Sequence, residues 1–267
     1  PVLNQDPFYD LDYNLCIVCA RCVRACDELR GDNAITLTER SGISLVGPAY
    51  GSSLLESGCE FCGSCIDVCP VGALVESDYK WDKAVESTST TCPQCPVGCQ
   101  LKLEVNKRGK VIRVIPELEA EANRGQACFK GKFGLDFINK RSRLKSPMIR
   151  RDGVLEDVSW EEAMSFVADK LNLYKGSAFA ALSSSRSTNE EAYILQKFTR
   201  SVMNSNNVDH SSNMRPEITE ILGDVLGYQA ATNSIWSIED SGCILVVSSN
   251  VTEEHNVASV AVKRGSR

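Results

Sequence analysis

Twelve of the thirteen cysteines in this 267-residue chain fall into three groups of four. The first two groups share the spacing C-x2-C-x2-C-x3-C, and a proline follows the second group. The third has the spacing C-x2-C-x3-C and a fourth cysteine well downstream. The groups are Cys16, Cys19, Cys22 and Cys26; Cys59, Cys62, Cys65 and Cys69; and Cys92, Cys95, Cys99 and Cys128.

This spacing is typical of cubane iron–sulfur ligands. Two intervening residues let a tight loop direct successive sulfurs to the corners of one cube, whose irons bind soft thiolates. In paired C-x2-C-x2-C-x3-C runs, three thiolates hold one cluster and the fourth reaches across to the other. We therefore predict three 4Fe-4S clusters. Their predicted ligands are Cys16, Cys19, Cys22 and Cys69 (cluster 1), Cys59, Cys62, Cys65 and Cys26 (cluster 2), and Cys92, Cys95, Cys99 and Cys128 (cluster 3).

Two other interpretations of the cysteines are weaker. Zinc also binds C-x2-C pairs, but as two pairs and not as a triplet with a trailing fourth ligand. A disulfide framework is typical of small secreted proteins, whereas 267 residues can bury a core of their own. The thirteenth cysteine, Cys243, opens an apolar stretch, and we predict a free buried thiol there.

The segment 1–88 contains an internal repeat around the first two cysteine groups. Each group is followed by a small apolar pair, Ala34-Ile35 and Ala73-Leu74, and an insert at about 36–58 separates the repeats. This predicts a ferredoxin-like domain with two clusters. The polar stretch Ser87–Thr91 is predicted to be a linker.

The rest of the chain predicts two further domains. Alternating apolar residues at 100–105 and 110–115, with a glycine turn between them, indicate a hairpin in a small β-rich 4Fe-4S domain at 89–150. Residues 151–267 alternate strand and helix, which predicts a parallel α/β domain. The predicted elements are a helix capped by Ser159 with Glu162 completing a capping box, strands at 178–182 and 244–247, and helices at 189–203 and 254–263.

The predicted fold class is therefore α+β followed by α/β. The chain ends at Arg267, where a doubly wound sheet would continue with another strand, so we expect the third domain to be truncated.

Charge and hydropathy restrict the partners. The net charge is −6, and residues 1–90 carry 14 acidic against 6 basic residues. Such an acidic end commonly faces a basic patch on a redox partner; the alternative is a solvated surface without a specific partner. Nucleic-acid binding finds no support. The longest apolar run, at 243–247, is too short to span a membrane. Reduced thiols in cluster motifs fit a cytoplasmic protein, which we predict, or one exported after folding.

Several motifs resemble one known family. Cys-Pro-Gln-Cys-Pro-Val-Gly-Cys at 92–99 and Ala-Cys-Phe-Lys-Gly-Lys-Phe-Gly at 127–134 resemble the cluster domain of molybdopterin oxidoreductases, in particular the catalytic subunit of formate dehydrogenase. The segments 184–193 and 206–210 continue the resemblance. Residues 1–90 resemble the two-cluster module of NAD-linked formate dehydrogenases, which is related to the large iron–sulfur subunit of NADH:quinone oxidoreductase (complex I).

The resemblance implies roles for particular residues. Lys130 has the position of a lysine that assists electron transfer between the last cluster and a pterin cofactor. A gap-free count places Arg215 where formate dehydrogenases carry a cysteine or selenocysteine metal ligand, and Pro216 where they carry a histidine. Arginine has no lone pair for a metal, and proline cannot transfer protons. Ser211 and Ser212 do not have the required offset, and His210 is interpreted as a core or surface histidine.

Three hypotheses for function follow. The first is an electron-relay subunit that is similar to formate dehydrogenase but has a degenerate metal site. Its partners would be 2Fe-2S and flavin/NAD-binding subunits, or ferredoxin. The second is an active formate dehydrogenase with molybdenum or tungsten on molybdopterin guanine dinucleotide, linked to NAD or ferredoxin. The third is a scaffold with structural clusters, which the intact cysteine spacing and Lys130 argue against.

Overall fold

The computed structural model describes residues 2–51, 53–79, 81–210, 216–229 and 231–267. It has a mixed α/β fold that divides into two compact units. The first consists of residues 1–139 together with 231–267, and the second of residues 140–230. Residues 231–267, which the sequence analysis assigns to the third domain, belong to the unit that carries the cysteine groups.

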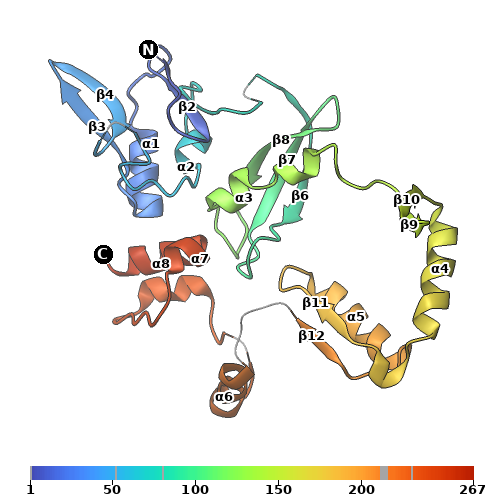
Figure 1. Ribbon diagram of the computed structural model, residues 1–267. Coiled ribbons are helices and arrows are strands. Elements are labelled where there is room, and N and C mark those ends of the chain that lie inside the picture. Colours follow the sequence, from blue (N-terminus) through green and yellow to red (C-terminus); the bar gives the residue numbers. More distant parts are fainter. Residues whose placement is uncertain (1, 52, 80, 211–215, 230) are drawn as a thin grey trace. The chain divides into compact units, whose positions relative to one another are not determined.

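The N-terminal part of the first unit contains both cysteine repeats, as Figure 1 shows in blue and cyan. An antiparallel sheet has the order β1-β2-β5, and a separate hairpin of β3 and β4 occupies most of the predicted insert. A short helix and a π-helical turn, η1, carry the third and fourth cysteines of the first repeat, and another short helix lies within the second repeat. The bounds are β1 Val2–Leu3, β2 Tyr9–Asp12, α1 Arg21–Arg24, η1 Ala25–Arg30, β3 Ile35–Arg40, β4 Ile43–Pro48, α2 Ser64–Asp67 and β5 Leu74–Glu76.

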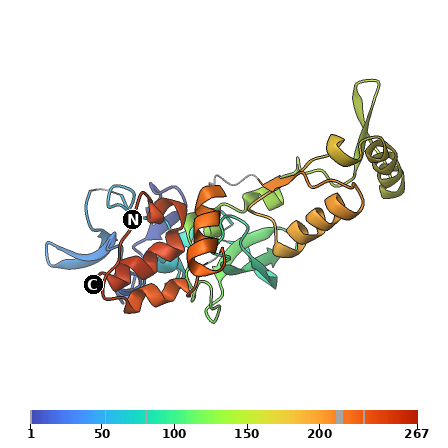
Figure 2. The same cartoon turned by 90° about the horizontal axis from the view of Figure 1, so that it is seen from below.

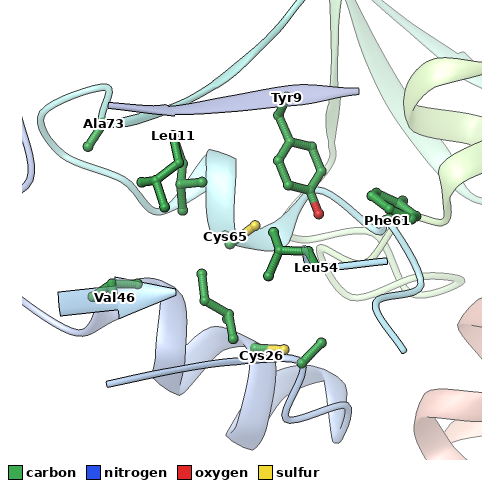
Figure 3. Close-up of a cluster of buried hydrophobic side chains, with 11 residues drawn as sticks. Tyr9, Leu11, Cys26, Val46, Leu54, Phe61, Cys65 and Ala73 are labelled. Atoms are coloured by element: carbon green, nitrogen blue, oxygen red, sulfur yellow. The ribbon is translucent and has the colours of Figure 1, made fainter. Parts of the chain in front are cut away.

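The core of this part holds the clustered cysteines. Ala34 and Ile35 after the first repeat and Ala73 and Leu74 after the second are all buried, so both apolar pairs are core positions. Figure 3 shows Tyr9 extending from β2 into the same group of side chains as Cys26 and Cys65. The sulfur-bearing loops therefore pack directly on the apolar core.

A second antiparallel sheet, with the order β6-β7-β8, carries the third cysteine group. The predicted hairpin is confirmed as β7 (Gln100–Asn106) and β8 (Val111–Pro116), and its apolar alternation buries Leu101 and Val114. The predicted linker at Ser87–Thr91 is wrong, because it lies in β6 (Ala84–Thr91). Serine and threonine are polar, but they fit an exposed edge strand that pairs with β7.

The two sheets are joined by contacts around α3 (Phe129–Phe133), which is followed by the 3₁₀ turn η2 (Asp136–Asn139). The rings of Phe8 and Phe133 stack with centroids 4.7 Å apart. The side chain of Lys132 is fully buried, and its Nζ lies 2.5 Å from Asp67 Oδ1. Helix α3 is therefore anchored to the ferredoxin-like part by both apolar and charged contacts.

The C-terminal segment completes the first unit with η4 (Ile235–Asp240), α7 (Val251–Glu254) and α8 (Asn256–Gly265). Figure 2 shows these helices beside the N-terminal segments, and Lys263 of α8 bonds Asp32 at 2.6 Å. The predicted helix at 254–263 is confirmed apart from a break at His255. The predicted strand at 244–247 is wrong: these residues form no strand, and Leu245 is 84% exposed. An apolar run needs a neighbouring strand to satisfy its backbone groups.

The second unit contains a hairpin, helices and one short parallel strand pair. Ser159 accepts a hydrogen bond from the Glu162 amide, as predicted, but the Glu162 carboxylate contacts Arg151 instead of completing a capping box. The predicted helix at 189–203 ends two residues earlier, at Ser201. The bounds are β9 Met148–Arg151, β10 Val154–Asp157, α4 Trp160–Asn172, η3 Gly176–Ala178, β11 Ala181–Ser183, α5 Asn189–Ser201, β12 Val208–His210 and α6 Pro216–Leu226.

Candidate iron–sulfur centres

The two cysteine repeats have the same unusual backbone conformation. Val18 and Phe61, each directly before the second cysteine of its repeat, have φ values of 55° and 50°. Ala20 and Gly63, each directly after that cysteine, have φ values of 58° and 79°. Left-handed conformation is rare for a β-branched residue such as valine and indicates strain that the surrounding structure maintains. The alternating conformation turns the loop so that successive cysteines face one side.

The first sulfur set lines one cavity. Cys16, Cys19 and Cys22 of the first repeat meet Cys69 of the second there, beside the apolar side chains of Leu11, Val46 and Leu74. Burial raises the pKa of the Cys22 thiol to about 11, and the charges of Cys69 and Cys16 contribute to this rise. The structure thus brings together the four residues that the sequence assigns to cluster 1.

The second set is the most buried. Cys26, from the first repeat, lies among the same core side chains as Cys65. Burial raises the pKa of Cys59 to about 12, with further contributions from Cys62 and Cys26. Burial also raises the pKa of Cys65, and Cys62, Cys59 and Cys26 add to this. The four residues that the sequence assigns to cluster 2 are therefore close neighbours.

The third set lines a cavity between β7, α3 and the C-terminal helices. Cys92, Cys95, Cys99 and Cys128 surround it, together with Lys130. Burial raises the pKa of Cys99 to about 12, and the charges of the other three cysteines contribute. A Cβ atom at Gly134 would lie 2.5 Å from the Lys130 carbonyl oxygen, so only glycine permits this close backbone approach beside the site.

The donor sets fit cubane clusters. All thirteen cysteines are free thiols, so none belongs to a disulfide framework. In the described ranges, no three His, Cys, Asp or Glu side chains are arranged to hold a single metal ion. Several thiols converge at each of the three sites, where burial and mutual repulsion disfavour bare thiolates. Iron bound there would supply the positive charge that deprotonates them.

Lys130 lies at the rim of the third cavity. Its Nζ donates to the Glu253 carbonyl oxygen at 3.1 Å and lies 5.7 Å from the centre of the Phe129 ring. Its role in electron transfer stays a prediction. The ammonium is nevertheless positioned next to the sulfur set to which its sequence spacing assigned it.

The structure describes only some of the residues that were predicted around the pterin site. Ser211, Ser212 and Arg215 lie outside the described residues, and Pro216 begins α6. His210 is exposed at the end of β12. The prediction that Cys243 is buried is wrong: it is exposed, because the segment that it opens forms no strand with a covered face.

Two residues beside the second set escaped the sequence analysis. Tyr9 is 1% exposed, and its Oη lies 3.1 Å from Cys59 Sγ. Arg30 is fully buried and hydrogen-bonds residues far away in the sequence. Neither belongs to a recognisable spacing pattern. The one available signal was the position of Arg30 shortly after Cys26.

No helix in the described parts of the chain has both the length and the apolar character that a membrane crossing requires. Residues 6–75 match the ferredoxin-like domain of NADH-quinone oxidoreductase subunit 3. Residues 85–140 match the Fe4S4 domain of molybdopterin oxidoreductases, and residues 143–265 match the molybdopterin oxidoreductase domain.

Individual relatives cover nearly all of this chain. It is 39% identical over 99% of its length to a subunit of the NADH-quinone oxidoreductase of Rhizobium meliloti (strain 1021). It is 31% identical over 98% of its length to the probable oxidoreductase YjgC of Bacillus subtilis (strain 168). It is 29% identical over 99% of its length to a putative formate dehydrogenase of Staphylococcus aureus (strain USA300).

The chain spans 31% of the length of each of these relatives. The first of these domain matches encloses the first two cysteine groups, and the second encloses the third group. This chain therefore belongs to the molybdopterin oxidoreductase family, with the ferredoxin-like domain of NADH-quinone oxidoreductases at its N-terminal end.

Proposed function

We propose that this chain relays single electrons through three 4Fe-4S clusters within a multi-subunit oxidoreductase. The observation that carries the proposal is the convergence of cysteines from separate loops at three places in one compact unit. Each cluster would supply a one-electron redox centre. The chain would hold these centres in a fixed arrangement and exclude water from them with apolar side chains.

The proposal includes the crossed ligand assignment. Cys69 lines the cavity of the first repeat, and Cys26 is a close neighbour of the second repeat. Such crossing holds two clusters close together, as in two-cluster ferredoxins. The third set follows in the same unit and extends the relay.

We further propose that the pterin metal site is degenerate, with Arg215 and Pro216 in the places of the metal ligand and its histidine. That assignment rests on a gap-free count. The match to the putative formate dehydrogenase, by contrast, does contain gaps in this chain, because it extends over 310 aligned positions and the chain has 267 residues. The metal-site proposal therefore requires a direct assay of bound metal.

The proposed partners are 2Fe-2S and flavin/NAD-binding subunits, or ferredoxin, in the cytoplasm. The name of the Rhizobium relative describes one subunit of an NADH-quinone oxidoreductase, which supports a role in a larger assembly. The excess of acidic residues in 1–90 provides a surface that would speed encounter with a basic partner.

An active formate dehydrogenase is the second candidate, favoured by the Staphylococcus relative and by the match to the molybdopterin domain. Elemental analysis of the purified full-length protein separates the two candidates. The relay predicts about twelve irons per chain without molybdenum or tungsten, and no formate-dependent dye reduction. One molybdenum or tungsten per chain with formate turnover would establish the second candidate. Eight irons with stoichiometric zinc would contradict the three-cluster relay.

A further inference from the structure

Arg30, at the end of η1, is a fully buried cation that links three parts of the chain. Its Nη1 donates to Gln126 Oε1 and to the Ala127 carbonyl oxygen, both at 3.2 Å. Its Nη2 donates to Glu60 Oε2 at 3.1 Å and to Asn256 Oδ1 at 2.6 Å. Burying a charge is costly unless its donors are satisfied, so such a residue needs a strong local reason to be there.

The contacts of Arg30 lie next to ligands of two predicted clusters. Glu60 directly follows Cys59 of the second set, and Ala127 directly precedes Cys128 of the third. Burial lowers the pKa of Arg30, but the charge of Cys62, followed by those of two carboxylates, outweighs it and raises the pKa. Arg30 Nε has no hydrogen-bond partner among the described residues. The guanidinium is therefore located where the second and third sets approach each other.

Tyr9 supplies a second polar group to the same set. Its ring is held in the core by a tilted contact with Phe61, and its Oη lies 3.1 Å from Cys59 Sγ. When Cys59 is a thiolate, the hydroxyl is the donor. Hydrogen bonds to ligand sulfurs and buried charges are two of the factors that set the potential of an iron–sulfur cluster.

Asp32 brings a negative charge to the second sulfur set, opposite in sign to the charge of Arg30. Its carboxylate lies 4.0 Å from Arg30 Nε and 2.6 Å from Lys263 Nζ. Burial raises the pKa of the Cys26 thiol, and the charge of Asp32 raises it further. The second set is thus surrounded by a buried cation, a hydroxyl donor and a buried anion, each from a different position in the chain.

We propose that Arg30 and Tyr9 raise the reduction potential of cluster 2, the one assigned to Cys26, Cys59, Cys62 and Cys65, and that Asp32 lowers it. This rests on the proposed three-cluster relay and identifies cluster 2 as its middle centre, between cluster 1 and cluster 3. In the step concerned, one electron passes from a neighbouring 4Fe-4S cluster to cluster 2. The donor is oxidised, cluster 2 is reduced, no bond forms or breaks, and no proton is taken up.

The sign follows from electrostatics. Reduction makes the cluster and its thiolates one charge more negative, so a nearby cation or hydrogen-bond donor stabilises the reduced form, and a nearby anion destabilises it. At low effective dielectric, a charge within about 10 Å changes this balance by more than thermal energy. Removing Arg30 has a large effect, because it also leaves Glu60 and Asp32 less compensated.

The test is an anaerobic redox titration of the full-length protein with its clusters assembled, followed by electron paramagnetic resonance and fitted as three one-electron components. The loss of one component in Cys62→Ala identifies cluster 2. We expect Tyr9→Phe to lower its reduced-to-oxidised ratio at fixed potential about threefold. We expect Arg30→Gln to lower that ratio about tenfold, or about 59 mV, and Asp32→Asn to raise it.

Two control variants remove a tyrosine hydroxyl or an arginine cation at other positions in the chain. Tyr50→Phe deletes a hydroxyl from a side chain that is 75% exposed, and Arg264→Gln deletes a cation of α8 that pairs with Glu239 of η4. Both should leave all three components in place. Because Arg30→Gln also breaks buried contacts, Tyr9→Phe and Asp32→Asn decide the matter if that variant fails to assemble.

The outcomes separate this inference from the relay itself. Fewer than three components in the unaltered protein would contradict the relay. Three components with cluster 2 unmoved in Tyr9→Phe and Asp32→Asn would overturn the inference and leave the relay intact. Equal shifts of all three components, or shifts of the same sign in these two variants, would also overturn it, since a general structural effect would then explain the data.

Discussion

Cys69 belongs to the second repeat by sequence, yet it lines the cavity of the first. We therefore expect Cys69→Ala to damage cluster 1 and to spare cluster 2, because the remaining three thiolates of the first repeat lose their fourth partner. Iron content and the paramagnetic resonance spectrum of each variant measure this. Cys26→Ala is the matched change and should damage cluster 2. If Cys69→Ala destroyed the cluster of Cys59, Cys62 and Cys65 instead, the crossed assignment would be wrong.

Glu76 is a residue whose charge opposes folding. Burial raises its pKa from 4.5 to about 7, although Lys132 Nζ lies 3.5 Å away. Between these two values the folded state binds a proton that the unfolded state has released. The contribution of Glu76 to stability is therefore most favourable below pH 4.5, is lost as the pH rises through 7 and is level above it.

We expect Glu76→Gln to remove this dependence. Between pH 5 and pH 8, the free energy of unfolding should change less in the variant than in the unaltered protein. The difference between the two changes should be up to about 3 kcal/mol. Unfolding midpoints across that range measure it, and Glu161→Gln, at an exposed carboxylate of α4, is the control. Parallel pH profiles for Glu76→Gln and the unaltered protein would show that Glu76 does not titrate in this range.

At the scale of elements, α5 begins with a complete capping box. Thr188 Oγ1 accepts from the Glu191 amide at 3.2 Å, and Glu191 Oε2 accepts from the Thr188 amide at 2.9 Å. We expect Thr188→Ala to destabilise the start of this helix by about 1 kcal/mol, whereas Thr188→Ser should retain most of it. Hydrogen exchange of the amides at 189–192 measures the difference. Equal exchange in the two variants would exclude the cap as a source of stability.

Elements differed in how far local sequence predicted them. The β7–β8 hairpin was predictable because its alternation and turn are local. Thr188 has the same kind of capping signature as Ser159 but was not recognised, and at Ser159 the box is incomplete because Arg151 binds Glu162. The run at 244–247 is apolar enough for a strand, but it forms none, and whether a strand forms depends on what lies beside it.

For the whole molecule, the contact between α8 and the cysteine repeats is the feature that closes the first unit. Lys263 Nζ bonds Asp32 at 2.6 Å and also contacts Glu60. Its side chain is 25% exposed, so these ion pairs are partly shielded from water. Lys263→Gln leaves two carboxylates without one of their cations, and we expect it to destabilise the unit by about 3 kcal/mol.

Hydrogen exchange of residues 256–265 and susceptibility to protease measure this loosening. Arg264→Gln, on the same helix, is the control: it removes a more exposed cation that pairs with Glu239. It should cost less than about 1 kcal/mol. Similar effects of the two changes would mean that α8 is not held by the buried ion pairs.

The sequence by itself determined which residues could bind clusters, because ligand spacing, the internal repeat and the small apolar pairs are properties of short stretches. It also determined the order of the three family domains. The tertiary structure decided what depends on segments far apart in the chain. It brought Cys69 to the first repeat, and it placed Tyr9, Arg30 and Asp32 around the second sulfur set. It also returned residues 231–267 to the unit that holds the cysteines. Spacing along the chain reports local geometry, whereas burial and charge around a site arise only when distant segments pack together.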